Sequence, residues 1–185
     1  MKTLNRLLML ALLAMLSFSL ASCDDDYDIA ETLEGTWEGN MYISSEYNGV
    51  VYDAVYSKIC FDIDPFHWTS GSGYWVDYYD EYGWGRNYIA NHIDWKVRDR
   101  AIYIYFREEG SELWIEDYRL TDRHFTGYIY DGDNRVKFSL IHTSSPRWDD
   151  YYYGYDRDWY AKGMVDNENG NATSTEAPKR MLRVR

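Results

Sequence analysis

Cysteine, proline and positive charge are scarce in this sequence of 185 residues. It contains two cysteines, Cys23 and Cys60, and three prolines, none of which interrupts the central part of the chain. Lysine and arginine together number 19, against 31 aspartates and glutamates, which gives a formal net charge of −12. So acidic a surface repels nucleic acid, and we expect no nucleic-acid partner.

Long hydrophobic runs are also missing outside the first 22 residues. There, Lys2 and Arg6 precede an apolar stretch that starts at Leu7 and ends in small residues. The stretch is too short for a comfortable membrane span, and its layout is typical of an export signal that is removed from the mature protein. Taking Lys2 and Arg6 from the 19 basic residues leaves 17 against 31 acidic ones, a formal charge of −14.

The predicted signal, residues 1–22, is followed by a cysteine in the sequence Leu20-Ala21-Ser22-Cys23. This ending resembles the bacterial lipobox, in which an aliphatic residue and two small ones precede a cysteine. The resemblance implies that Cys23 carries lipid and anchors the mature protein to the membrane without spanning it. Cys60 is then left without a disulfide partner, and we expect a buried structural thiol.

Residues 23–32 are expected to form an acidic tether, because Asp24, Asp25 and Asp26 follow the cysteine directly. The acidic run resembles the export signal of Bacteroidota lipoproteins that are sent to the cell surface. That resemblance implies a surface-exposed protein whose partner is outer-membrane lipid. In other Gram-negative lineages an aspartate after the cysteine resembles an inner-membrane retention signal, which is the alternative.

The central part of the chain predicts eight β-strands and has no sustained helical period. Tight turns such as Asn48-Gly49 separate the strands, so consecutive strands should pair with one another. We predict an all-β fold, an eight-stranded antiparallel up-and-down barrel, with a two-sheet β-sandwich as the alternative. The predicted strands cover residues 36–44, 50–63, 67–78, 88–97, 101–106, 112–120, 124–130 and 135–143.

The segment from Leu33 to Gly39, with the sequence LEGTWEG, opens this predicted domain. It resembles the G-x-W signature of lipocalins and of the lipocalin-like domains in Bacteroidota lipoproteins. The resemblance implies that Trp37 closes the bottom of the barrel and that an arginine just past the last strand stacks on it. Arg147 is the candidate partner, through a cation–π contact. The domain, with an aromatic C-terminal extension, is expected to cover residues 33–165.

No pattern of catalytic or metal-binding residues stands out. The four histidines lie on different predicted strands, and none has the spacing of a metal site; they are His67, His92, His124 and His142. Gly71-Ser72-Gly73 is not followed by the strand-to-helix switch of a nucleophile elbow. We therefore expect a protein that is not an enzyme and holds no metal or cofactor.

Aromatic residues, in contrast, are abundant, with 20 Tyr and 8 Trp. Such side chains favour binding surfaces, because they combine apolar area with a polar tip. One group lies on a loop expected at the rim of the barrel and supplies the ligand-binding candidates Tyr78, Tyr79, Tyr82 and Trp84. A second group follows the last strand and either packs over the barrel's outer tyrosines or forms a platform for sugars or proteins; it comprises Trp148, Tyr151, Tyr152, Tyr153, Tyr155, Trp159 and Tyr160.

The C-terminal residues 166–185 are expected to form a disordered tail, because residues 166–178 have almost no apolar side chain to bury. These features favour a lipid-anchored binding module that holds a small apolar or amphipathic ligand in the cup of its barrel, through the rim aromatics. The alternative is a surface interaction protein with a solid barrel, which binds glycan or protein through exposed aromatics.

Overall fold

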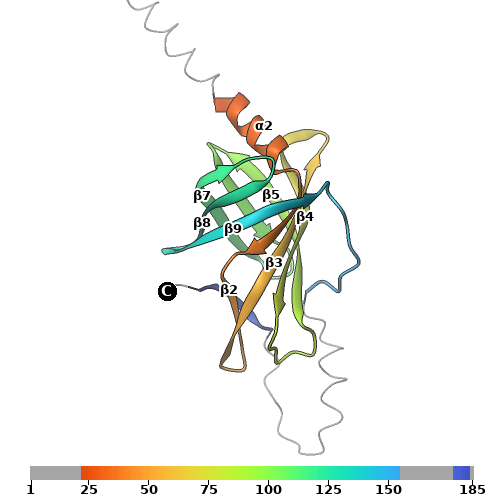
Figure 1. Cartoon of the computed structure of the whole chain (residues 1–185), viewed down its shortest axis with the longest axis vertical. Helices are drawn as coiled ribbons and strands as arrows, with labels where there is room; N and C mark the ends of the chain where they lie inside the picture. The colour runs from red at the N-terminus through yellow and green to blue at the C-terminus, as the bar shows by residue number, and fades with distance from the viewer. Residues whose placement is uncertain (1–21, 155–176, 184–185) are drawn as a thin grey trace, which may run out of the picture.

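The computed structural model describes residues 22–154 and 177–183. Within these ranges ten strands form one antiparallel sheet, in the order β1-β9-β8-β7-β6-β5-β4-β3-β2-β10. Because β1 pairs with both β9 and β3, eight of them close into a barrel (Figure 1). The predicted eight-stranded antiparallel barrel is confirmed, and the sandwich alternative is wrong. The strands are β1 (Gly35–Asn40), β2 (Ile43–Tyr47), β3 (Val50–Asp64), β4 (His67–Tyr79), β5 (Tyr88–Arg98), β6 (Ala101–Phe106), β7 (Ser111–Leu120), β8 (His124–Asp131), β9 (Asn134–Ser144) and β10 (Lys179–Leu182).

Tight turns fix the register of the barrel, as the sequence predicts. Asn48 and Gly49 both have positive φ angles, which a two-residue hairpin loop of type I′ requires. Asp99 and Arg100 have the same conformation between β5 and β6. The first predicted strand, residues 36–44, differs from the structure, since it is divided into β1 and β2 at Tyr42, whose φ is 52°.

The seventh strand changes its inward-facing side along its length. Leu113 and Ile115 are buried at its start, and strict alternation would then turn Asp117 into the core. Instead the pairing with β8 shifts between Glu116 and Arg119, and Asp117 has a φ of 49°. This bulge lets Tyr118 pack against the core and leaves the aspartate exposed.

The interior of the barrel is filled by large side chains. One contiguous cluster of buried residues runs through it and contains alternate residues of single strands, such as Ile93, Trp95 and Val97 of β5. The largest side chains in it are fully buried and include Trp37, Trp75, Phe61, Phe106, Phe125 and Phe138. Each contributes about 1.5–3 kcal/mol of hydrophobic free energy, so packing of the interior is the main source of stability.

Glycine lets β4 bend tightly over its neighbour. A Cβ atom on Gly73 would lie 1.8 Å from the carbonyl oxygen of Cys60, and one on Gly71 would lie 1.9 Å from that of Asp62. No side chain fits between these strands at either position. The two glycines therefore allow the close backbone approach that barrel closure needs.

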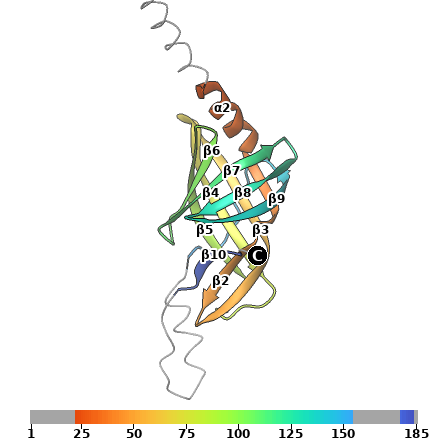
Figure 2. The ribbon, with the colours of Figure 1, turned by 90° about the vertical axis from the view of Figure 1, so that its left-hand side faces the viewer.

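The segment expected to be an acidic tether is a helix, α2 (Ser22–Leu33), which lies at one end of the barrel (Figures 1 and 2). Asp26 is almost fully buried, and its carboxylate accepts hydrogen bonds from the backbone N–H groups of Asp99 (3.0 Å) and Arg100 (2.8 Å). An acidic side chain here holds the helix to the β5–β6 turn, so the prediction of a free tether is wrong for this part. No helix in the described ranges is long and apolar enough to cross a membrane.

The prediction of a disordered C-terminal tail is wrong for residues 179–182. They form β10, which pairs in antiparallel register with β2 at the end of the barrel opposite α2 (Figure 2). Leu182 is buried there, and so is the side chain of Arg180. The rest of that predicted tail, residues 166–176, 184 and 185, lies outside the described residues.

Candidate functional site

The four predicted ligand-binding residues do not form one rim. Tyr79 and Trp84 are 2% and 4% exposed and belong to the main core, where Trp84 packs edge-on against Tyr47, Tyr52 and Tyr79. Tyr78, the neighbour of Tyr79 on β4, points to the outer wall. Tyr82 alone is exposed, at 44%. Successive residues of β4 face opposite sides, so Tyr78 and Tyr79 point away from each other. Trp84 is buried in the core and is not accessible to a ligand. The predicted site is therefore not assembled.

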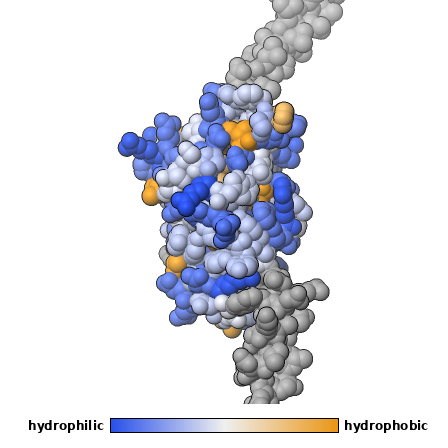
Figure 3. Space-filling model, turned by 90° about the vertical axis from the view of Figure 1, so that its right-hand side faces the viewer, coloured by the Kyte–Doolittle hydropathy of each residue, from blue (hydrophilic) through white to orange (hydrophobic). Residues whose placement is uncertain are grey.

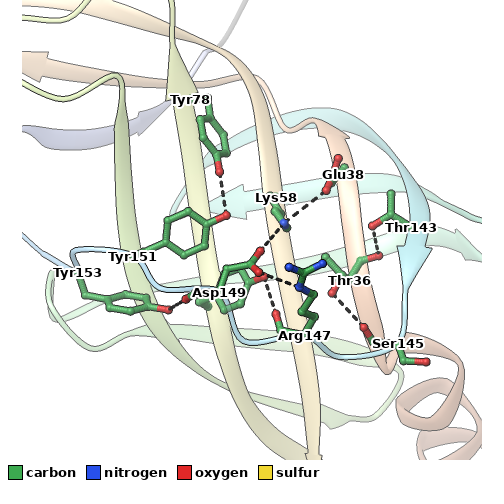
Figure 4. Close-up of polar contacts among 11 residues, drawn as sticks. Thr36, Glu38, Lys58, Tyr78, Thr143, Ser145, Arg147, Asp149, Tyr151 and Tyr153 are labelled. Carbon is green, nitrogen blue, oxygen red and sulfur yellow. Dashed lines mark hydrogen bonds and ion pairs between the residues drawn. The ribbon is translucent and has the colours of Figure 1, made fainter.

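The second aromatic group packs mainly against the outer wall, one of the two outcomes left open by the sequence. Tyr151 lies against Tyr74 and Tyr88, and its hydroxyl group is 2.8 Å from that of Tyr78 (Figure 4). Burial raises the pKa of Tyr153 to about 12. Trp148 and Tyr152 keep substantial exposure. Tyr155, Trp159 and Tyr160 lie outside the described residues.

An ion pair fastens this segment to the barrel (Figure 4). The ammonium group of Lys58 donates to Asp149 Oδ2 at 2.7 Å and lies 3.7 Å from Glu38 Oε1. The pKa of Asp149 is lowered by the hydrogen bond from Lys58. Beneath the segment Cys60 is fully buried, which confirms the predicted buried thiol, and this burial raises its pKa.

The predicted stacking of Arg147 on Trp37 is wrong. Trp37 is fully buried, and its indole N–H donates to the carbonyl oxygen of Leu33 at 2.7 Å. The ring that lies beside it is that of His142, with centroids 4.9 Å apart. Arg147 has a 76% exposed side chain and pairs with Asp149 at 3.0 Å instead. Trp37 thus lies in the core, but a histidine takes the place expected for the arginine.

A groove of about 510 Å³ opens in the barrel wall beside β10 and is the candidate ligand site. It arises where β1 ends and leaves part of β9 uncovered. The side chain of Asn40 accepts a hydrogen bond from the N–H of Tyr42 (2.7 Å), which turns the chain away at the end of β1. β1 pairs with β9 only from Ser139 onward, so the first half of β9 has no partner on that side among the described residues.

Apolar and cationic side chains share the lining of this groove. Val136 and Phe138 come from the inward face of β9, and Tyr42 lies across from them. Arg135 and Lys137 alternate with the two apolar residues on the same strand, as the predicted eighth strand requires. Arg183 follows β10; it ion-pairs with Asp53 at 3.1 Å and donates to the carbonyl oxygen of Ala54 at 3.0 Å. Three cations gathered at one groove stand out in a chain with a net charge of −12.

The groove adjoins a row of aromatic side chains on the outer wall. Lys96, Tyr103, Trp114, Tyr130 and Arg135 stand directly opposite one another on five consecutive strands. The rings of Trp114 and Tyr130 are stacked, 5.8 Å apart, and the Lys96 ammonium lies 5.4 Å from the Tyr103 ring. We call these five residues the aromatic row. It spans four strand spacings, about 19 Å.

Other exposed large apolar side chains include Val50, Val51, Val55 and Tyr56 of β3, and Phe66 and Trp68 around the β3–β4 turn. Figure 3 shows a largely hydrophilic face with separate hydrophobic residues. Within the described residues, no group of three or more His, Cys, Asp or Glu side chains is arranged to hold a metal ion.

The groove could not be predicted from the sequence, because it joins β9 to residues beyond residue 176. The sequence signal that points to it is the alternation of the cations Arg135 and Lys137 with the apolar residues Val136 and Phe138.

Comparison of the chain with protein-family models, with curated proteins and with solved structures gave no match. Its function is therefore inferred from the geometry of the barrel itself.

Proposed function

We propose that this chain is a lipid-anchored envelope lipoprotein whose lipocalin-like barrel is a non-enzymatic binding module for a small amphipathic anion. The observation that carries the proposal is the groove beside β10, where an apolar floor lies next to three cations. Apolar surface with a few well-positioned polar groups is the usual composition of a small-molecule site. The ligand's apolar part would lie on Val136 and Phe138, and its anionic group would face Arg135, Lys137 and Arg183.

The packing of the interior supports a site in the wall over a site in a deep cup. Residues that would line such a cup are fully buried against one another, among them Trp75, Phe106 and Phe61. A ligand there would have to displace well-packed side chains. The groove needs no such rearrangement, because β1 ends before it covers the first half of β9.

The proposed anchor is Cys23, at the start of α2. Because Asp26 holds this helix to the barrel, the domain would lie close to the membrane surface. Replacing Cys23 with Ser should abolish incorporation of labelled fatty acid and release the protein from the membrane fraction. Protease treatment of intact cells then tests surface display, since degradation of the lipidated protein supports it and full protection contradicts it.

Binding of a dansylated undecanoic acid, followed by fluorescence, tests the groove. Arg135→Glu with Lys137→Glu should weaken binding by about tenfold or more, equivalent to about 1.4 kcal/mol. The matched control is Arg119→Glu with Arg123→Glu, which makes the same charge change on exposed residues near α2. Equal effects of the two pairs, or no saturable binding to the wild type, would count against the groove.

The aromatic row supports a second candidate function, binding of a glycan at the cell surface. Its three aromatic side chains are half-buried and lie in register, with a cation at each end. Trp114→Ala should abolish retention on an array of oligosaccharides, whereas Tyr152→Ala, on another face, should leave it unchanged. Loss of stability without any glycan binding by the wild type would show that the row only supports the sheet.

A further inference from the structure

Arg180 enters the barrel from the end opposite α2 and is buried there. Its side chain is only 6% exposed. Nη1 lies 2.7 Å from Asp77 Oδ2, and Nε donates to Glu109 Oε1 at 3.2 Å. The guanidinium carbon is 4.3 Å from the ring centroid of Phe106 and 5.4 Å from that of Trp75. Two carboxylates and two aromatic rings, which come from β4, β6 and the turn after β6, thus surround one guanidinium group.

The barrel orients these carboxylates through its own side chains. Asp77 is fully buried and accepts hydrogen bonds from the hydroxyl group of Ser57 (2.6 Å) and the indole N–H of Trp75 (2.7 Å). Glu109 accepts a hydrogen bond from the amide of Asn91 at 2.7 Å. Asn91 is also fully buried, and within the described residues its Oδ1 atom has no hydrogen-bond partner.

Without a cation this chamber would hold buried negative charge that its hydrogen bonds do not neutralise. Burial of an uncompensated charge is strongly unfavourable, so the chamber selects a cationic occupant. A planar guanidinium fits better than an ammonium group, because it can face two carboxylates and stack on the rings at once. The burial also raises the pKa of Asp77, although the nearby Arg180 opposes that change.

The backbone around Arg180 is held by addition of a strand. Lys179 to Leu182 pair with residues 43–46 of β2, at the edge of the sheet. Arg180 and Leu182, two residues apart, face the same side, and both are buried. Main-chain pairing with an edge strand, combined with pockets for alternate side chains, is how many domains bind extended peptides.

We propose that this end of the barrel is a peptide-binding site for an extended segment with an arginine followed two residues later by an apolar residue, and that β10 is its built-in occupant. The partner is a second protein that presents such a segment and replaces β10. The site is distinct from the groove, although exchange would also remove Arg183 from the groove lining. Covalent linkage gives β10 an advantage over a free peptide, so exchange is expected to be weak in the wild type.

The test uses the full-length chain and a fluorescein-labelled peptide of residues 177–185, with anisotropy as the readout. Arg180→Ala in the chain should weaken the binding of β10 to its own site. This variant should therefore bind the peptide at least about 30-fold more tightly than the wild type does. A peptide with Ala at the same position should bind the variant at least about 30-fold more weakly. Adding Asp77→Asn to the chain should reduce the preference for the arginine peptide, because Glu109 is then the one charged carboxylate left of the two.

A folded Arg180→Ala chain that shows no saturable binding at peptide concentrations of about 1 mM would overturn the proposal. Equal affinity for the arginine and alanine peptides would also overturn it. Leu182→Ala in the chain serves as a second receptor, because it weakens β10 without leaving the carboxylates uncompensated. Circular dichroism of each variant establishes that it is folded before the titration.

Discussion

At the residue scale, the side chains that distinguish this structure are charged side chains that are buried. Asp77 and Arg180 lie inside the barrel, and Asp26 is buried between helix α2 and the β5–β6 turn. Removing one partner of a buried pair costs more than the pair contributes, because the other charge stays buried. These residues therefore matter for stability more than the many exposed charges that give the chain its net charge of −12.

The Asp77–Arg180 pair should show this coupling directly. Arg180→Ala is expected to lower the free energy of unfolding by about 3–5 kcal/mol, because Asp77 is left without its cation. Asp77→Asn with Arg180→Ala should cost less than the sum of the two single changes. Urea unfolding of the four proteins gives the coupling free energy, and simple additivity would mean that the two side chains do not depend on one another.

The Lys58–Asp149 ion pair should depend on pH in a defined direction. The folded-state pKa of Asp149 is lowered, so the pair contributes fully above the unfolded pKa of about 3.9 and is lost as pH falls through the lower folded value. Asp149→Asn should therefore destabilise the protein by about 1–2 kcal/mol at pH 7 and by much less at pH 2. Asp150→Asn is the control at an exposed neighbour, and an equal loss at both pH values would refute the assignment.

At the element scale, the strands of the barrel were predictable because glycine and asparagine turns mark their ends. The inward faces of β5, β6 and β9 follow the alternation of apolar side chains along each strand. This alternation breaks in β7, where the bulge at Asp117 changes the inward side. The predicted strand of residues 36–44 is divided at Tyr42. Both departures depend on backbone conformations that a period of two does not encode.

Helix α2 and strand β10 were missed because each is held by tertiary contacts. A run of aspartates has low helix propensity, and docking of Asp26 on the β5–β6 turn compensates for it. β10 has only four residues, and an arginine such as Arg180 is expected at the surface. Its burial depends on carboxylates and rings that lie far away in the sequence. The prediction of a ligand site at the rim was wrong for the same reason. Trp84 packs against rings that lie far away in the sequence, those of Tyr47 and Tyr52.

The docking of α2 predicts the effect of a single substitution. Asp26→Ala removes both hydrogen bonds to the β5–β6 turn and should cost about 1–3 kcal/mol. Hydrogen exchange in residues 25–33 should become faster, while exchange in β3 and β4 stays slow, because the barrel closes without the helix. Asp28→Ala, an exposed neighbour, should change neither quantity.

At the scale of the whole molecule, the barrel is a packed body, and its proposed binding features lie at one end and on one wall. The groove and the chamber of Arg180 lie beside β10, and α2 lies at the opposite end of the barrel (Figure 2). The aromatic row crosses the outer wall from β5 to β9. If Cys23 carries lipid, this polarity directs the groove and the chamber away from the membrane. The proposed anchor and the proposed ligand site then lie at opposite ends of the barrel.

Native mass spectrometry of the protein purified from its own host is the sharpest test of whether the groove holds a ligand. We expect a bound amphipathic anion that is absent from the Arg135→Glu/Lys137→Glu variant and retained in the Arg119→Glu/Arg123→Glu variant. A wild-type protein that carries no such ligand, and that binds no dansylated undecanoic acid when purified, would show that the groove is not a site for such an anion.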